Sequence, residues 1–569
     1  MRKKSVFPAA LLIIAAVLVF SSVSGCGGGT WVTAPSPTPT VSPTVSPTIT
    51  PTPGIPSVVS VTPANDAVDV EPDTTVTVTF SETMNPATIN DTTFLLTGPL
   101  GSVAGLVTYD ELTSTATFTP AVELGKLMQY TVTVTTGAES LSGVPMTADF
   151  TSTFTTRDGM WGTPEIIDGD AVEAYSPQVA VDTEGNAVAV WYQNDGSYSR
   201  IYSNRYNAIS GTWGTAQAIA SNIGNAYAPQ VAVDLDGNAV AVWHQYDGQY
   251  WNIYFNRYDA LLDEWGTAQT IEGNAGEAVV PQVAVDLDGN AVAVWCQWDG
   301  SYYIINSNRY DAALGTWGVV QTISDNTTDA NFSQVAVDPE GNAVAVWYQF
   351  DGSHVSIYSN RYDAISGMWG MAQVIEGNTG EAYNPQVAVD PDGNAVAVWM
   401  EEEGGNFNIY SNRYDAPSDT WGTPQAIEGN TGNALDPQIA VDPSGNAVAV
   451  WHQYDGQYWN IYFNRYDALL DEWGTAQTIE GNTRNAFYPQ VAVDPSGNAV
   501  AVWHQSDGSY GSIYSNRYNS LSGTWGSAQT IESNTGDAFY PQVAVDFQGN
   551  AVVVWEQNDG LIIWANWFR

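Results

Sequence analysis

The sequence predicts an all-β protein: a small β-sandwich followed by an eight-bladed β-propeller with four-stranded blades. Three observations predict this fold class. A Trp-Gly pair recurs every 52 residues from Trp161 to Trp525. β-branched and polar residues alternate between residues 57 and 156. The repeated unit lacks the 3.6-residue periodicity of an amphipathic helix, and a fixed period of this size is typical of a solenoid or a propeller.

The composition excludes several classes of protein. The 569 residues carry 15 Lys and Arg against 61 Asp and Glu, a formal net charge of −46. Apolar residues make up 44% of the chain and aromatic residues 12%, so it has enough apolar surface to fold and differs from a disordered acidic chain. Because an acidic surface repels phosphates, we expect no nucleic-acid partner.

Residues 1–25 have the pattern of an export signal, with a basic start and an apolar run at 9–20 that is too short to span a bilayer. The run leads to Val23-Ser24-Gly25-Cys26, which resembles the lipobox of bacterial lipoproteins. This resemblance implies cleavage before Cys26 and a lipid on its sulfur. We therefore expect a lipid-anchored protein of the bacterial cell envelope, at the cell surface or the outer membrane, with the membrane as a partner. Ordinary secretion is the alternative.

Residues 26–56 are expected to form a linker that starts at the lipidated cysteine. Proline alternates with Thr and Ser from Pro35 to Pro56. Proline fixes φ and removes a backbone donor, so such a segment stays extended and holds the following domains away from the membrane.

Residues 57–157 are predicted to form an Ig-like β-sandwich. Runs such as Val76–Phe80 and Tyr130–Val134 alternate β-branched or aromatic residues with threonine, and about seven such runs fit this fold. The segment resembles the bacterial Ig-like domain of S-layer-type surface proteins, on residues that include Val61-Thr62-Pro63 and Phe118-Thr119-Pro120. The resemblance implies a spacer or adhesion module without catalytic residues.

Residues 158–569 are predicted to form the propeller. Each 52-residue unit holds four strand-like runs, in the second unit Pro229–Asp234, Asn238–Gln245, Ile253–Asp259 and Trp265–Ile271. The second run is apolar on both faces, as expected for a sheet that packs against a neighbour on each side. Four antiparallel strands per unit are typical of a propeller blade.

The two ends of the repeat predict how the ring closes. The region begins with one strand, Trp161–Ile167, and ends with three, Pro541–Asp546, Asn550–Gln557 and Ile562–Phe568. Together they complete one blade, which makes eight with the seven intact units and leaves no free sheet edge.

The repeated phrase Pro-Gln-Val-Ala-Val-Asp resembles β-propeller repeats of bacterial surface proteins. The Asp-x-x-Gly-Asn turn that follows distantly resembles the Asp-box of sialidase-like propellers. It departs from that box because Ala232, not Ser or Thr, stands two residues before Asp234. The resemblance therefore does not imply sialidase activity.

Aromatic residues in the loops are the candidate ligand-binding residues, because aromatics among Asn, Asp and Gln suit sugar stacking or protein contact. Packing between blades is the alternative role. The candidates are Tyr246, Tyr250, Trp251, Trp298, Tyr302, Tyr454, Tyr458, Trp459, Tyr488 and Tyr540.

One arginine per unit follows an asparagine, and we expect a structural role for this series: pairing with aspartate to tie strands or blades together. An anion or glycan site between blades is the alternative. The series is Arg205, Arg257, Arg309, Arg361, Arg413, Arg465 and Arg517.

We expect no metal site and no cofactor. The Asp-rich turns could attract Ca²⁺, but they lack the ligand spacing of a calcium loop and fit simple turns better. The histidines lie on separate units and offer no convergent zinc ligands.

These observations predict a cell-surface lipoprotein that is not an enzyme: a binding or adhesion scaffold that presents propeller loops to an extracellular glycan or protein ligand. No catalytic residue is predicted, because near-copies of one unit hold equivalent groups apart, whereas catalysis needs unlike groups that converge. The alternatives are a glycan-active hydrolase or lyase with its site at the propeller axis, and a purely structural envelope component.

Overall fold

The computed structural model describes residues 54–569 except for 170–172, 222, 274–275, 326, 378–379, 430–431, 482–483, 507, 533–535 and 558–560. This described part is all-β: it has no α-helix, and its single short helix is a 3-10 turn at Pro86–Thr88. None of its helical segments has the length and apolar character needed to cross a membrane. Cys26 and the predicted signal and most of the linker lie outside the described residues.

The first domain is a two-sheet sandwich. Its sheets have the strand orders β1-β3-β7-β6 and β2-β9-β8-β4-β5. The buried side chains of Val78, Phe94 and Phe118 belong to the core between the sheets. The strands are β1 (Val58–Thr62), β2 (Ala67–Val70), β3 (Val76–Phe80), β4 (Phe94–Gly98), β5 (Gly101–Ser102), β6 (Gly105–Asp110), β7 (Thr115–Pro120), β8 (Gln129–Val134) and β9 (Phe150–Thr156).

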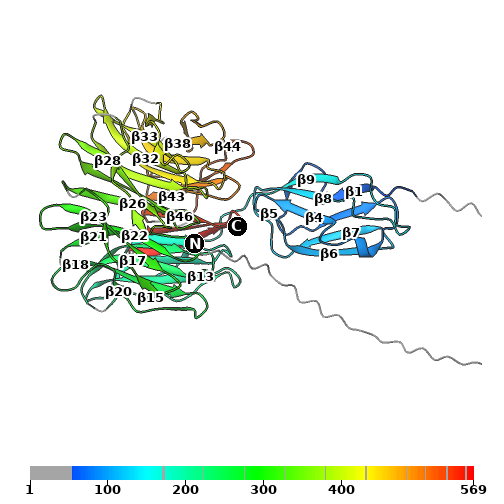
Figure 1. Cartoon of the computed structure of the whole chain (residues 1–569), viewed down its shortest axis with the longest axis horizontal. Helices are drawn as coiled ribbons and strands as arrows, with labels where there is room; N and C mark the ends of the chain where they lie inside the picture. The colour runs from blue at the N-terminus through cyan, green and yellow to red at the C-terminus, as the bar shows by residue number, and fades with distance from the viewer. Residues whose placement is uncertain are drawn as a thin grey trace, which may run out of the picture. The chain divides into compact units, whose positions relative to one another are not determined.

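The repeat forms eight antiparallel sheets, which confirms the predicted propeller fold. Figure 1 shows these sheets following one another along the chain from cyan through green and yellow to red. We number the blades 1 to 8 by their innermost strands, which are β11 (Ala174–Val181), β16 (Ala226–Val233), β21 (Ala278–Val285), β26 (Ala330–Val337), β31 (Ala382–Val389), β36 (Ala434–Val441), β41 (Ala486–Val493) and β46 (Ala538–Val545).

The second and third strands of each blade are also long. The second strands are β12 (Ala187–Asn194), β17 (Ala239–Tyr246), β22 (Ala291–Trp298), β27 (Ala343–Phe350), β32 (Ala395–Glu403), β37 (Ala447–Tyr454), β42 (Ala499–Ser506) and β47 (Ala551–Gln557). The third strands are β13 (Ser199–Asn207), β18 (Trp251–Asp259), β23 (Tyr303–Asp311), β28 (Val355–Asp363), β33 (Asn406–Asp415), β38 (Trp459–Asp467), β43 (Gly511–Asn519) and β48 (Ile562–Phe568).

The outermost strand is interrupted in blades 1 to 7, where the sequence predicts one continuous strand. The Asn256 side-chain amide donates to the Gly266 carbonyl at 3.1 Å, in the gap between the two pieces, and to the Ile219 carbonyl of the preceding blade at 3.0 Å. The pieces are β14 (Thr212–Trp213), β15 (Gln217–Ala218), β19 (Glu264–Trp265), β20 (Gln269–Thr270), β24 (Thr316–Trp317), β25 (Gln321–Thr322), β29 (Met368–Trp369), β30 (Gln373–Val374), β34 (Thr420–Trp421), β35 (Gln425–Ala426), β39 (Glu472–Trp473), β40 (Gln477–Thr478), β44 (Thr524–Trp525) and β45 (Gln529–Thr530).

The last blade is assembled from both ends of the repeat, as predicted. Strand β10 (Glu165–Ile166) pairs with β48, giving the order β10-β48-β47-β46, and Trp161 bridges Phe568. The side chains of Ile167, Trp191 and Val554 then belong to one buried cluster between blades 8 and 1. The first and last blades are thus in direct contact.

Each blade buries both faces against its neighbours. In blade 2, Ala241 and Trp243 are fully buried and pack on Val188 and Ile201 of blade 1. The Trp243 indole N–H donates to the Gln245 side chain at 3.0 Å. The equivalent indole bond recurs in every blade, to a glutamine in seven blades and to Glu401 in blade 5, so the apolar strand ends in a fixed polar pair.

Candidate functional site

Eight residues near the start of the innermost strands share an unusual backbone. Each has φ between 49° and 54°, in the left-handed region. Each also lies within the register shift between the first and second strands, such as the one between Tyr227 and Gln230. A proline follows in seven of the eight blades and cannot donate to the ladder, so the strand bulges there. We call these residues the axial ring: Ser176, Ala228, Val280, Phe332, Asn384, Asp436, Tyr488 and Tyr540.

Five members of the axial ring, from blades 4 to 8, line one cavity of ≈270 Å³. Phe332, Tyr488 and Tyr540 are 51%, 42% and 48% exposed. Five glutamines from the same strands complete the wall, and they are uncharged donors and acceptors: Gln334, Gln386, Gln438, Gln490 and Gln542. The cavity therefore combines aromatic faces with hydrogen-bonding groups.

An aromatic cluster supports the tyrosine side of the cavity. The Tyr488 and Tyr540 ring centroids are 5.2 Å apart. Behind them, the His504 ring stacks on Phe539 at 5.0 Å and lies 6.4 Å from Phe487. These contacts join blades 7 and 8, so both tyrosines are held by packed rings and present their exposed faces to the cavity.

The polar part of the cavity lining is built around Asp436. Its Oδ1 accepts a hydrogen bond from the Asn384 amide at 3.0 Å, and its Oδ2 lies 3.8 Å from His452 Nδ1. His452 is 4% exposed, and burial lowers the pKa of this imidazole to about 4, so it is neutral at pH 7. Among the described residues, His452 Nδ1 has no hydrogen-bond partner.

Side chains at the position of His452 in other blades contact the next member of the axial ring. The Val280 N–H donates to His244 Nδ1 at 3.4 Å, and the Ser176 N–H donates to Glu556 Oε1 at 2.6 Å, from blade 8 to blade 1. Burial raises the pKa of Glu556. This position therefore lies next to the axial ring.

The predicted ligand-binding residues separate into two groups. Tyr488 and Tyr540 line the axial cavity. The others lie in the loops between second and third strands or at the strand ends beside them: Tyr246, Trp298, Tyr302 and Tyr454 are exposed, whereas Tyr250, Trp251, Tyr458 and Trp459 are half-buried.

Several of the loop aromatics pack on one another. Trp459 lies 5.1 Å from the His452 ring and 6.1 Å from Phe487, and Trp251 lies 5.7 Å from Tyr227. The two tryptophans thus contribute to packing behind the axial residues.

The arginine series lies between blades. Arg205, Arg361 and Arg413 each place the guanidinium 5.2–5.7 Å from the ring centroid of a tyrosine 53 residues later, in the next blade. Arg309 also lies over a tyrosine of the next blade, and its guanidinium forms an ion pair with Asp286 at 3.2 Å. Arg257 and Arg465 lie within 4.0 Å of Asp259 and Asp467, respectively.

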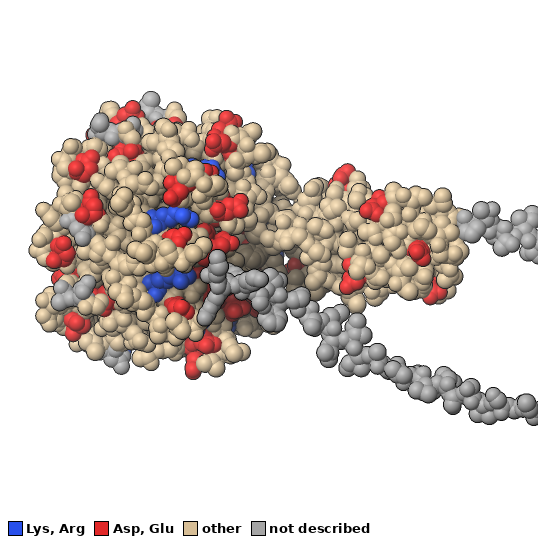
Figure 2. Space-filling view, viewed as in Figure 1, with Lys and Arg blue, Asp and Glu red and all other residues tan. Residues whose placement is uncertain are grey.

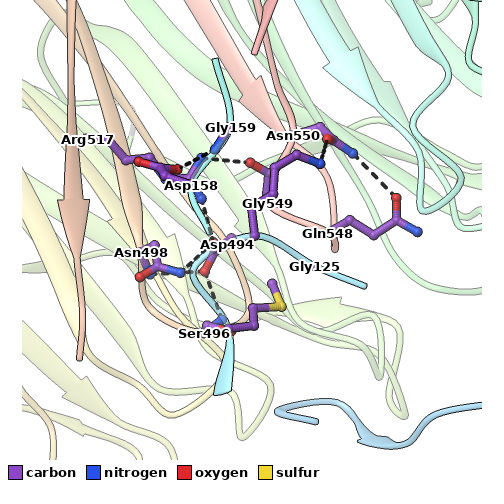
Figure 3. A network of polar contacts seen from close by, with 12 residues as sticks. Gly125, Asp158, Gly159, Asp494, Ser496, Asn498, Arg517, Gln548, Gly549 and Asn550 are labelled. Carbon is purple, nitrogen blue, oxygen red and sulfur yellow. Dashed lines mark hydrogen bonds and ion pairs between the residues drawn. The ribbon is translucent and has the colours of Figure 1, made fainter. Parts of the chain in front are cut away.

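Arg517 joins three parts of the propeller (Figure 3). Its guanidinium lies 3.2 Å from Asp158 and 3.4 Å from Asp494, donates to the Gly549 carbonyl at 2.8 Å, and packs over Phe568. Burial raises the pKa of Asp494, and the guanidinium opposes that rise. The contacts connect blade 7 to the closing blade.

No three His, Cys, Asp or Glu side chains in the described part of the chain lie close enough together to hold a metal ion. The aspartates of the Asp-x-x-Gly-Asn turns instead accept hydrogen bonds from their own turns. Asp234, for example, accepts from the Asn238 backbone and side-chain amides, both at 2.8 Å.

Comparison with known proteins identifies the first domain. Residues 53–156 match the family model of the bacterial Ig-like domain. That segment is a bacterial Ig-like domain. No curated protein matches the chain as a whole.

Solved structures similar to the chain have low identity. A protein of unknown function from Dyadobacter fermentans is 12% identical over 72% of this chain and 98% of its own, with a TM-score of 0.39. Polysaccharide lyase Uly1 is 9% identical over 72% and 99%, with a TM-score of 0.42. The NanB sialidase of Streptococcus pneumoniae is 10% identical over 87% and 93%, with a TM-score of 0.31.

The prediction that the protein is not an enzyme is wrong against these comparisons, since the similar structures include polysaccharide lyases and a sialidase. That prediction assumed that near-identical repeats hold only equivalent groups. The axial ring differs from that assumption, because Asn384, Asp436 and Tyr488 are unlike groups in consecutive blades that line one cavity.

Phe332, Asn384, Asp436 and His452 were not among the site residues predicted from the sequence. A signal for the first three was present: one position, usually the residue before Pro-Gln, differs in almost every unit, whereas the Gln-Val-Ala-Val-Asp stretch that follows hardly changes. In a chain of near-copies, the position that varies is the one that can make the ring asymmetric.

Proposed function

We propose that this protein is a glycan-directed surface protein whose propeller takes a carbohydrate into the axial cavity. One observation carries the proposal: aromatic and polar side chains from five blades line a single cavity of ≈270 Å³. They are Phe332, Tyr488, Tyr540, Asn384 and Asp436. Sugar rings present C–H faces that stack on aromatic rings and hydroxyls that bond to amides and carboxylates. The volume is near the roughly 300 Å³ lower end of small-molecule sites.

The proposal is tested by glycan binding to the full chain and to Tyr488→Ala and Tyr540→Ala. Each truncation removes a stacking face from the cavity, and we expect affinity to fall at least about tenfold. The matched control is Tyr510→Ala, because Tyr510 is 43% exposed in the same blade as Tyr488 but does not line the cavity. Unchanged binding in both cavity variants would contradict the proposal.

A second candidate function, a glycan-active hydrolase or lyase, is favoured by the Asp436–His452 pair. His452 is neutral at pH 7 and can accept a proton at Nδ1, 3.8 Å from a carboxylate that would stabilise the resulting cation. Proton abstraction by such a base is the first step of an elimination, and a carboxylic acid or imidazolium can protonate a leaving oxygen.

Product analysis separates the two candidates. An enzyme releases shorter oligosaccharides, with new reducing ends for a hydrolase or unsaturated ends for a lyase. Asp436→Asn and His452→Phe should then abolish turnover while the aromatic faces still bind the glycan. Intact polymer after prolonged incubation with every bound glycan would exclude the enzyme.

We further propose that a lipid on Cys26 anchors the protein to the bacterial envelope, with the Pro/Thr/Ser segment and the Ig-like domain as spacers. The lipobox-like sequence and the export signal support this proposal. Cys26→Ala should move the protein from the membrane fraction to the soluble exported fraction, which fractionation and lipid labelling would detect.

A further inference from the structure

We infer that the axial cavity selects a cationic glycan, one whose recognised sugar carries a free amine, over neutral and anionic glycans. This inference rests on the proposed function and adds the substrate class. It follows from the charges around the cavity, from the aromatic faces that line it, and from one buried imidazole.

The cavity offers negative charge without a compensating cation. Asp436 lines it with a 36% exposed side chain, and no lysine or arginine is among its lining residues in the described structure. Glu556, in the same blade as Tyr540, adds a second carboxyl group beside the axial ring. A carboxylate or sulfate ester on a sugar would enter this field against Asp436, without a partner.

The arginines nearest to this edge of the sheets are engaged elsewhere. Arg200, in β13 of blade 1, forms an ion pair with Asp195 at 2.6 Å, and the Arg484 side chain lies against Gly508, between β42 and β43 of blade 7. Figure 2 shows the wider setting: Asp and Glu side chains are spread over the visible surface, with few Lys and Arg among them. The net charge of −46 draws cations toward the molecule and repels anions.

The aromatic residues favour the same ligand charge. Tyr488, Tyr540 and Phe332 present exposed rings to the cavity, and the faces of such rings attract an ammonium group. An amine held among these faces and within reach of Asp436 is bound by a carboxylate and by ring quadrupoles at once. A hydroxyl or an acetamide group at the same place carries no charge, so it gains neither the attraction to the carboxylate nor the attraction to the ring faces.

His452 gives an independent indication that this side of the cavity awaits a ligand. The ring is 4% exposed, its Nδ1 lacks a hydrogen-bond partner among the described residues, and it faces Asp436 at 3.8 Å. A neutral imidazole with its proton on Nε2 and a carboxylate are both acceptors toward a donor placed between them. An ammonium group supplies three donors and can satisfy both acceptors.

The test uses the full chain and three probes of similar length: oligomers of glucosamine, oligomers of N-acetylglucosamine, and oligogalacturonate. Binding is measured by calorimetry below the pKa of the sugar amine. We expect glucosamine oligomers to bind at least tenfold more tightly than their acetylated counterparts, with no detectable binding of oligogalacturonate. The preference should decrease as salt is added.

Asp436→Asn should reduce the preference for the amine to about twofold or less while keeping the binding that stacking provides. The matched control is Glu402→Gln, which removes one charge from the exposed end of strand β32 on the same edge of the sheets, outside the cavity. It should leave the preference unchanged. If both variants lost the preference for the amine equally, the preference would come from the net charge of the protein. This result would overturn the assignment of the selectivity to the cavity.

The outcomes separate this inference from the proposed function. Binding of oligogalacturonate or equal binding of acetylated oligomers, when abolished by Tyr488→Ala, would overturn the charge selectivity and leave the axial glycan site in place. Binding of the probes that Tyr488→Ala and Tyr540→Ala do not weaken, or no binding of any glycan, would overturn both.

Discussion

At the scale of single residues, the second strand of each blade carries one position whose side chain faces the axial ring of the next blade. Tyr192, His244, Cys296 and Tyr348 occupy it in the first four blades. Burial is the dominant influence there: it raises the pKa of Tyr192 to about 12 and that of Cys296 to about 11, and it lowers the pKa of His244 to about 4. Each group is therefore held in its uncharged form at pH 7.

His244 makes stability depend on pH. Below its ordinary pKa of 6.5 the unfolded imidazole takes up a proton, whereas the folded imidazole stays neutral until about pH 4. The unfolded state then binds more protons, so stability falls as the pH drops from 6.5 to 4, by on the order of 3 kcal/mol for this group. His244→Tyr, which copies blades 1 and 4, should remove this loss.

The measurement is the free energy of unfolding of both proteins by urea between pH 7 and pH 4. The free energy of unfolding should depend less steeply on pH in the variant, by an amount that corresponds to the uptake of close to one proton on unfolding. Parallel curves would show that His244 titrates normally in the folded chain.

At the scale of secondary-structure elements, the blades are joined by side chains at fixed positions of the strands. The asparagine of each third strand donates to a carbonyl of the preceding blade, as Asn360 does to Ile323 at 2.9 Å. The arginine that follows it reaches the tyrosine of the next blade, as Arg361 does over Tyr414 at 5.6 Å. Neighbouring sheets are thus connected in both directions from one pair of residues.

The Arg361–Tyr414 contact should contribute to stability beyond simple burial. We expect a coupling free energy of about 1 kcal/mol between Arg361→Gln and Tyr414→Leu, the usual size of a partly buried cation–π contact. A double-mutant cycle in urea unfolding measures it. Additive effects of the two substitutions would mean that the guanidinium and the ring do not interact.

Blade 5 breaks the Trp-x-Gln pattern with a fully buried Glu401, whose Oε2 accepts from the Trp399 indole at 2.9 Å. Glu401→Gln restores the amide of the other seven blades and removes a buried carboxyl group. We expect it to raise the free energy of unfolding by about 1 kcal/mol or more.

The reciprocal change, Gln349→Glu in blade 4, should destabilise the protein. The Gln349 amide donates a hydrogen bond to Asp325, and a carboxylate at position 349 would repel the Asp325 carboxylate. Thermal unfolding compares both variants with the parent chain. A lower transition temperature for Glu401→Gln would show that the carboxylate is required where it is.

The elements could be predicted from the sequence because period and alternation encode them directly. The 52-residue step and the apolar second strands indicated four-stranded blades, and the unequal ends indicated a shared one. The gap in the outermost strand depends on where the Asn256 side chain points, which a pattern does not contain. Only part of the axial site could be predicted. Tyr488 and Tyr540 were predicted as aromatic candidates, whereas the place of Asp436 in the site depends on the arrangement of five blades around one cavity.

At the scale of the whole molecule, the ring depends on a few residues at its N-terminal edge. Ile167 is 1% exposed and packs in one cluster with Trp191 and Ile563, which come from opposite ends of the repeat. Its N–H donates to the Ile563 carbonyl at 3.0 Å. Blades 8 and 1 therefore meet across this residue.

Ile167→Asp should destabilise closure by about 4 kcal/mol or more, because it places an unpaired carboxylate in that cluster. The adjacent Ile166→Asp is the matched control: Ile166 ends strand β10, directly before Ile167, but is 39% exposed, and its replacement should cost less than about 1 kcal/mol. Limited proteolysis and thermal unfolding report the difference. Equal behaviour of the two variants would show that the ring does not depend on this junction.

The left-handed residues near the axis have an evolutionary consequence. Because the backbone at that point is the same in every unit, a duplicated unit can acquire a new side chain there while the asparagine and arginine contacts between blades stay in place. Ser, Ala, Val, Phe, Asn, Asp and Tyr all occur there, although positive φ costs most of them on the order of 1 kcal/mol. Substitutions in the axial ring can thus alter the lining of the axial cavity while the rest of the propeller stays unchanged.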